Sequence, residues 1–330
     1  MILYFLFIIA ITFLYSWLLW KLDRYEHEPL KLLLGAFFWG AVPAILLSLL
    51  LEITGTASIK AWVSPGYQEL ASASLLAPVV EESVKALALL GLFKLAYWEF
   101  DDPMDGILYG GLVGFGFAMV EDFAYVSGSA HPMFVTAIRT IPFGLNHAFF
   151  TGMTGAAFGY ARLKKESTWR YVLPIVGLLF AMTFHAIHNL GVTVSSLTFA
   201  GTVLSFISDW MGVLWLLVIA LISLKQERKW IKNYLTDEVG SYLSEEDFEH
   251  ITSSGKKLKE WLNEGSPQEK KLRKRLYDLS VNLAFKKAEM AKNITDRQNK
   301  EVNKRIEHLR KELSKVQDEI ASLSESSGTS

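Results

Sequence analysis

The sequence of 330 residues contains no cysteine. Disulfide bonds, thiolate metal sites and a cysteine nucleophile are therefore excluded. A net charge of -1 lacks the basic excess that nucleic-acid binding needs, so no nucleic-acid partner is expected. Charge is also scarce before residue 224 and concentrated after it. This asymmetry predicts a membrane domain at 1–224 and a cytosolic helical tail at 225–330.

Long apolar runs fill the first domain. A helix needs about 20 mainly apolar residues to cross a bilayer. The first run has no basic segment before it and no small-residue cleavage site, so it is expected to be a retained span. The sequence predicts an all-α polytopic membrane bundle of about seven spans, at 2–20, 32–51, 70–95, 105–127, 140–161, 171–195 and 202–224.

The charged loops predict the orientation of these spans. Lysine and arginine gather after the first, third, fifth and seventh spans, whereas the other loops contain little beyond Lys60 and Arg139. By the positive-inside rule, the basic loops are cytoplasmic. We therefore expect a multi-pass protein in the lipid bilayer of a cell membrane, with its N-terminus outside and its tail in the cytoplasm.

Apolar residues recur at alternating spacings of four and three near the end of the tail. This pattern predicts a short coiled coil at 302–323. Two interpretations remain open: a homo-oligomer formed through this seam, or a helix that packs on its own neighbours. The positions are Val302, Ile306, Leu309, Leu313, Val316, Ile320 and Leu323.

Ionisable residues inside the spans are the most informative feature of the chain. Glu81, Glu82 and Lys85 interrupt the apolar run 70–95. A charge at the centre of an inserted helix costs roughly 2.5 to 3.5 kcal/mol, so such residues indicate function. Further polar groups at mid-to-outer depth in three other spans are Glu121, His147, His185 and Asn189. Together they predict a membrane-embedded active site.

The spacing of these residues indicates their chemistry. Glu81 and Lys85 share one helix face, as do His185 and Asn189. Two neighbouring carboxylates resist ionising together, while the ammonium can hold one as an anion. A carboxylate can take a proton from water, and an imidazole or amide can stabilise the resulting oxyanion. Pro78 cannot donate to the helix ladder, which predicts a free carbonyl near the site. The set predicts amide hydrolysis by activated water, without metal or cofactor.

Four blocks of sequence occur in order and carry these residues. They are EESVK at 81–85, the segment 102–125, HAFFT at 147–151 and HAIHN at 185–189. Together they resemble the PrsW family of glutamic intramembrane proteases, within the CAAX-protease-like superfamily. Members of that family act as site-1 proteases that cut an anti-sigma factor outside the bacterial cell membrane in a stress response. The resemblance implies a single-pass membrane protein as substrate.

The resemblance also implies residue roles. It makes Glu81 the general base, although spacing alone leaves Glu81 and Glu82 equivalent. Many members have Asn where this chain has Asp122, which leaves open whether that position donates or accepts. The remaining roles fall on Glu82 and Lys85 as charge partners, on Glu121 as the third acidic position, and on His147, His185 and Asn189 as water-positioning and oxyanion groups.

Other interpretations use the same residues. A metal-dependent protease could use His147, His185 and an acid, but the sequence has no His-Glu-x-x-His motif. A transporter or scaffold could use the buried charges as a proton relay. Prenyl-protein processing conflicts with the outer depth of the site. Three more polar residues are interpreted as packing or support: His188, Asp209 and Arg139.

Overall fold

The computed structural model describes residues 1–25, 28–96, 99–164, 167–195, 198–253, 255–291 and 296–327. All regular elements in these ranges are helices, with one isolated bridge between Val239 and Leu243. The all-α prediction is therefore confirmed. The described chain divides into two compact units, a larger one of residues 1–23 and 28–223 and a smaller one that begins its main segment at Leu224.

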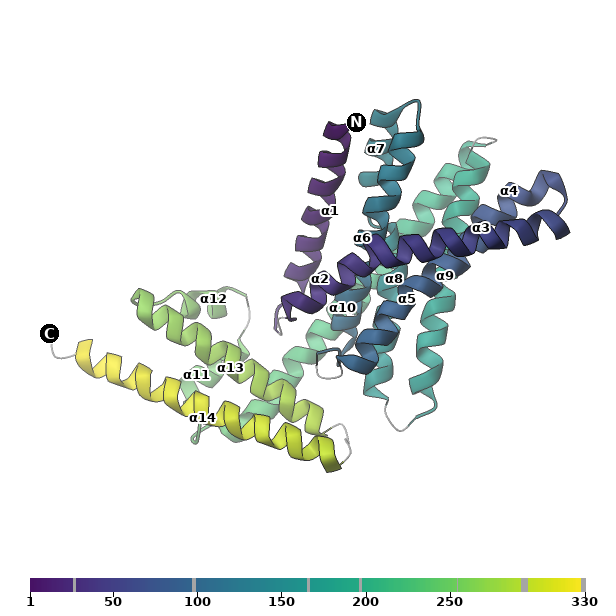
Figure 1. The fold of residues 1–330 in the computed structure, drawn as a ribbon. Coiled ribbons are helices and arrows are strands. Elements are labelled where there is room, and N and C mark those ends of the chain that lie inside the picture. The colour runs from purple at the N-terminus through teal and green to yellow at the C-terminus, as the bar shows by residue number, and fades with distance from the viewer. Residues whose placement is uncertain are drawn as a thin grey trace. The chain divides into compact units, whose positions relative to one another are not determined.

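The larger unit is a bundle of long helices and short π and 3₁₀ turns (Figure 1). The helix α10 (Phe199–Leu235) begins in this unit and ends in the smaller one. The other elements are α1 (Ile2–Leu22), α2 (Leu30–Trp39), η1 (Gly40–Ala44), α3 (Ile45–Trp62), η2 (Pro65–Tyr67), α4 (Gln68–Ala71), η3 (Ser72–Leu76), α5 (Ala77–Leu95), α6 (Pro103–Gly128), α7 (Pro132–Thr140), α8 (Asn146–Leu163) and α9 (Trp169–Ser195).

Several helices are long and apolar enough to cross a membrane, which makes this a multi-pass membrane protein. In the described chain they are Ile2–Leu22, Leu30–Trp62, Pro103–Gly128, Trp169–Ser195 and Phe199–Glu238. The predicted spans at 70–95 and 140–161 are also helical, but α5 carries four charged residues within its Ala77–Leu95 sequence. The start predicted at 140 is wrong: residues 141–145 form turns with Pro142 and Gly144, and α8 begins at Asn146.

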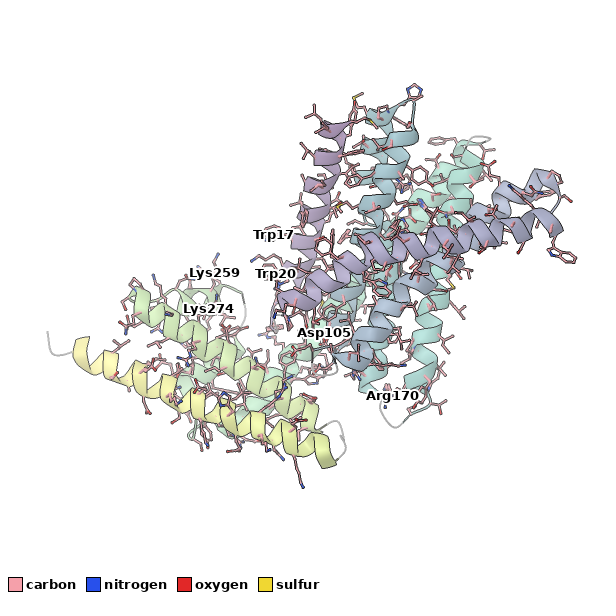
Figure 2. The ribbon with its side chains drawn as sticks, viewed as in Figure 1. Trp17, Trp20, Asp105, Arg170, Lys259 and Lys274 are labelled. Carbon is pink, nitrogen blue, oxygen red and sulfur yellow. The ribbon has the colours of Figure 1, made fainter. Side chains whose placement is uncertain are left out.

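The end of α1 carries aromatic and basic side chains. Figure 2 shows Trp17 and Trp20 in this part of the helix. Lys21 Nζ lies 5.8 Å and 5.1 Å from the centroids of these two rings. Tryptophan is enriched where a membrane meets water, with lysine beyond it. The sequence of α1 thus contains the residues expected at a membrane boundary.

The second predicted span continues well past its expected end. α2, η1 and α3 form one uninterrupted helical stretch that runs steeply across α6 in Figure 1. Pro43 lies within η1, and a proline is a usual cause of such a wide turn. Gly40 packs directly on the backbone of Val113 in α6. Because α3 reaches Trp62, Glu52 lies inside a helix and not in the predicted loop after residue 51.

Glycines bring α6 and α8 into backbone contact. An added methyl group on Gly106 would overlap Gly155 O, and one on Gly114 would overlap His147 O. Small residues on both helices permit this close approach, as in other membrane bundles. The contact fixes the position of the His147 backbone against α6, so helix packing positions one of the predicted site residues.

The smaller unit is also helical. Its elements after α10 are η4 (Thr236–Glu238), α11 (Glu245–Thr252), α12 (Lys256–Leu262), α13 (Pro267–Ala291) and α14 (Asp296–Ser327). α14 packs along α13, and Val302, Ile306, Leu313 and Val316 are buried within this single chain. The apolar seam of the predicted coiled coil therefore packs on a neighbouring helix of its own chain.

Candidate active site

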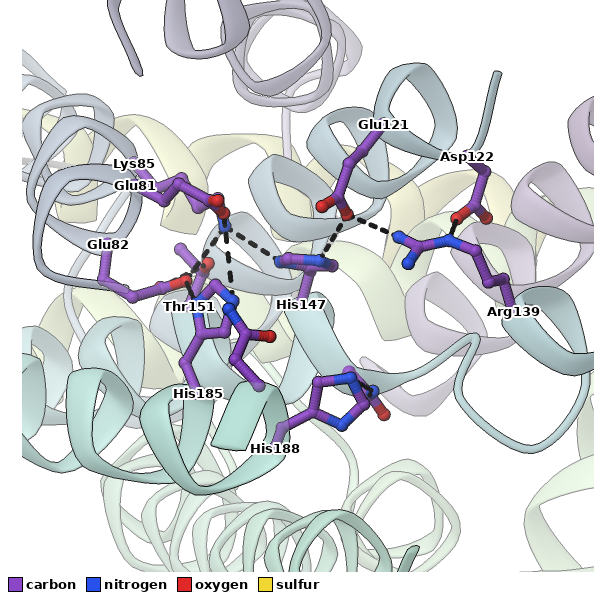
Figure 3. A network of polar contacts seen from close by, with 12 residues as sticks. Glu81, Glu82, Lys85, Glu121, Asp122, Arg139, His147, Thr151, His185 and His188 are labelled. Carbon is purple, nitrogen blue, oxygen red and sulfur yellow. Dashed lines mark hydrogen bonds and ion pairs between the residues drawn. The ribbon is translucent and has the colours of Figure 1, made fainter. Parts of the chain in front are cut away.

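Lys85 lies at the centre of a buried polar network (Figure 3). Its Nζ lies 3.1 Å from Glu81 Oε2 and 2.9 Å from Glu82 Oε1. The same nitrogen lies 2.9 Å from His147 Nδ1 and 3.7 Å from the centroid of the Phe117 ring. Positions three and four apart on a helix face the same way. The sequence of α5 thus brings three charges together, and α8 adds the imidazole.

Glu121 extends this network toward α7. His147 Nε2 lies 2.9 Å from Glu121 Oε2, and Arg139 Nη2 lies 2.6 Å from the same oxygen. Arg139 Nε also donates to Asp122, and its guanidinium lies 4.0 Å from the Tyr125 ring centroid. Asp122 therefore acts as an acceptor, and Arg139 joins the site directly where the sequence predicted only a support.

Glu82 is the more enclosed of the two adjacent glutamates. It accepts from Lys85, from His185 Nδ1 at 3.0 Å and from Thr151 Oγ1 at 3.2 Å, and it is only 1% exposed. Thr151 was not among the predicted site residues. Glu81 is 6% exposed and has fewer close donors. Lys85 is one of them, and His185 Nε2 lies farther away, 3.9 Å from Glu81 Oε2. The two carboxylates therefore differ in their surroundings, which their spacing could not show.

A cavity of about 620 Å³ opens beside the network. Its lining includes Glu81, Glu121, His147 and Asn189, all predicted from the sequence, but neither Glu82 nor His185. It also includes Glu52 of α3, which the sequence analysis missed. The available signal was a lone acid in an apolar stretch, placed one residue beyond the predicted span.

Asn189 is the one predicted site residue that stands outside the network. Its Nδ2 donates to Ala73 O at 2.8 Å, in the π turn η3. A π turn would pair Ala73 O with the N–H of Pro78, which does not exist. The free carbonyl predicted from Pro78 is therefore that of Ala73. The other six predicted residues join through the contacts described above: Glu81, Glu82, Lys85, Glu121, His147 and His185.

The cluster could also be considered for a metal ion. One ligand atom from each of Glu81, Glu82, His147 and His185 lies within 4.8 Å of the others, and these residue types suit zinc. Lys85 Nζ, however, already lies within 3.1 Å of three of these four groups. Two cations so close together in a low-dielectric site repel strongly. The arrangement therefore does not fit a metal ion beside a charged lysine.

Fold and site together define a multi-pass helical membrane protein with a buried cluster of acids and imidazoles beside a cavity. Residues 28–222 match the sequence model of the PrsW family, described as an intramembrane metalloprotease family. The match covers more than half of the chain, so the protein belongs to the PrsW family.

Individual relatives agree with this assignment. The chain is 32% identical over 151 residues to Protease PrsW of Geobacillus kaustophilus, covering 46% of this chain and 63% of the relative. It is 37% identical over 125 residues to Protease PrsW of Clostridioides difficile, which covers 37% of this chain and 50% of the relative. It is 28% identical over 151 residues to Protease PrsW of Bacillus subtilis, which covers 44% of this chain and 62% of the relative. The chain thus spans between half and two thirds of the length of these relatives. No solved structure matches it significantly.

Proposed function

We propose that this protein is a membrane-embedded endopeptidase in which Glu81 activates water to hydrolyse a peptide bond of a membrane protein. The observation that carries the proposal is the difference between the two adjacent glutamates. Glu81 lines the cavity, whereas Glu82 is enclosed by three donors and does not. A general base must reach the water that it deprotonates. Of the two adjacent glutamates, Glu81 is therefore the one that a water in the cavity can meet.

The neighbours of Glu81 support this role. Water gives its proton to Glu81, and its oxygen attacks the carbonyl carbon of the substrate. Lys85 contacts both glutamates, and its single positive charge compensates one of the two negative charges. Glu82 accepts from His185 Nδ1, so a neutral His185 keeps a lone pair on Nε2, 3.9 Å from Glu81 Oε2. That lone pair cannot donate to an oxyanion, and His185 does not line the cavity, so we assign it the task of holding Glu82 in place behind Glu81.

One of the predicted oxyanion groups lines the cavity and has a donor to spare. Asn189 lines it and uses one amide N–H on Ala73 O, which leaves its second N–H for a substrate oxygen. His147 already donates its Nε2–H toward Glu121. Of the predicted oxyanion groups, Asn189 is therefore the one whose donor we assign to this task.

The substrate class follows from the surroundings of the site. Several helices of this chain are long and apolar enough to span a bilayer, so we propose another membrane protein as the substrate. A single-pass protein, such as the anti-sigma factor that the family resemblance implies, is the substrate that we propose. Cleavage at the extracytoplasmic side, with the N-terminus outside and the tail in the cytoplasm, completes the proposal.

The deciding experiment compares new protein N-termini in membranes from cells that express the wild type or Glu81→Gln at equal levels. Glu99→Gln, outside the cavity, is the matched control. We expect fragments of a single-pass protein with the wild type and the control but not with Glu81→Gln. The same fragments from Glu81→Gln would remove Glu81 as the base. If the new N-termini are identical in cells with the wild type, with either variant and without the protein, a scaffold or transporter is favoured.

A further inference from the structure

Asp209 is a buried acid that has no part in the mechanism above. Asp209 sits in the apolar segment of α10 and is 1% exposed. A carboxylate inside a membrane-crossing helix is costly and marks function by default. Its Oδ2 lies 2.7 Å from His188 Nδ1 on α9. The acid is therefore kept together with an imidazole from a different helix.

His188 is held on several sides. The Asn146 amide nitrogen lies over the ring, 3.2 Å from its Nδ1 and 3.5 Å from its Nε2, and the Phe143 ring lies edge-on with its centroid at 5.2 Å. Ser205 Oγ donates to the His188 carbonyl at 2.8 Å, which fixes the backbone without touching the ring. The side chain is still 12% exposed and lines the same cavity as Glu81. Figure 3 shows its ring beside the main network.

Asp209 and His188 are arranged as a carboxylate that orients an imidazole for proton transfer. A carboxylate that accepts from Nδ1–H fixes the imidazole orientation and stabilises its charged form. The other nitrogen, Nε2, can then carry a proton to a ligand in the cavity. Glu81 and His188 approach this cavity from α5 and α9. A base and an acid on separate helices can serve two different steps of one reaction.

We propose that His188, oriented by Asp209, donates the proton that the leaving amine needs; this inference rests on the proposed function. After water has attacked and Glu81 holds its proton, the carbon–nitrogen bond breaks and its electron pair stays on nitrogen. That nitrogen takes the Nε2 proton of the His188 imidazolium. Glu81 later releases its proton to water, and His188 regains one from water, so protons balance over a turnover.

The test varies the need for a leaving-group proton. The substrate segment found by comparing N-termini is synthesised with either an amide or a thioester at the cleaved bond, and the full-length protein is assayed in detergent. A thiolate leaves without protonation because its thiol pKa is about 8.5, whereas an amine does not. We expect His188→Gln to lower amide turnover about 100-fold and thioester turnover less than about 3-fold. Asp209→Asn should shift the ratio the same way.

Controls separate this role from packing and from the proposed function. Ser205→Ala changes α10 one turn before Asp209 and removes a contact to the His188 backbone, not to its ring. It should leave the ratio of amide to thioester turnover unchanged. Equal losses on both substrates, or no loss on either, in His188→Gln would overturn the inference alone. If His188→Gln fails to fold, Asp209→Asn decides by the same ratio. Glu81→Gln should lose both activities; full turnover there would overturn the proposed function instead.

Discussion

Lys85 Nζ lies 2.9 Å from His147 Nδ1, and this contact fixes the state of the imidazole. A lysine ammonium donates hydrogen bonds and accepts none. Nδ1 of His147 must therefore accept, which leaves the ring proton on Nε2, 2.9 Å from Glu121 Oε2. His147 thus connects the cation of α5 with the acid of α6, and its own donor is already in use.

Replacing Lys85 by methionine tests how much the network depends on this cation. Glu81 and Glu82 would keep their buried positions without the ammonium that contacts them. Removing one partner of a buried ion pair costs about 3 to 5 kcal/mol. We expect that loss in the free energy of unfolding, followed by tryptophan fluorescence in detergent, together with loss of cleavage. Lys94→Met, exposed at the end of α5, is the control. Unchanged unfolding of Lys85→Met would contradict the central role of the ammonium.

A second prediction concerns the glycine contact that positions His147. Gly114→Ala places a methyl group on His147 O and must push α8 away from α6. Overpacking of this kind costs about 1 to 3 kcal/mol, and a shift of the site by about 1 Å can lower activity about 100-fold. Cleavage rate and thermal unfolding both report on it. Gly35→Ala, where an added methyl meets nothing within 4 Å, should leave both unchanged. Equal behaviour of the two variants would mean that the helix contact does not position the site.

The parts of the site that could be predicted from the sequence depend on local geometry. The contacts of Glu81 and Glu82 with Lys85 follow from helix spacing alone. Apolar runs of spanning length likewise predicted the membrane helices, because a bilayer imposes that length on any helix that crosses it. Helix spacing and span length are both properties of one continuous segment, so each can be read from that segment alone.

Contacts between helices could not be predicted in this way. The pair of His188 and Asp209 joins two helices, and no spacing rule relates them. Thr151 donates to Glu82 across 69 positions of sequence. Glu52 was missed because the predicted span ended at residue 51, whereas α3 continues to Trp62. Contacts between separate helices decide the placements of His188, Asp209 and Thr151.

The smaller unit gives a prediction about assembly. Leu313 is fully buried within one chain, in the seam that α14 packs on α13. Truncating such a leucine to alanine costs about 2 to 5 kcal/mol. We therefore expect Leu313→Ala to unfold this unit more easily and to leave the mass measured by light scattering unchanged. Glu319→Ala, on the exposed face, is the control. Dissociation of an oligomer by Leu313→Ala would instead support the homo-oligomeric coiled coil.

The last prediction concerns metal. Lys85 Nζ lies among the groups that would otherwise ligate an ion, so hydrolysis by Glu81 should not need one. We expect the purified protein to keep its cleavage rate after dialysis against a strong chelator. The substrate for this assay is the one found by comparing the wild type with Glu81→Gln. Its zinc content, measured in parallel, should be well below one ion per chain. If chelation abolishes cleavage and zinc alone restores it, Lys85 must leave the cluster in the active state. In that case Lys85→Met would bind zinc more tightly than the wild type, because the competing cation is gone.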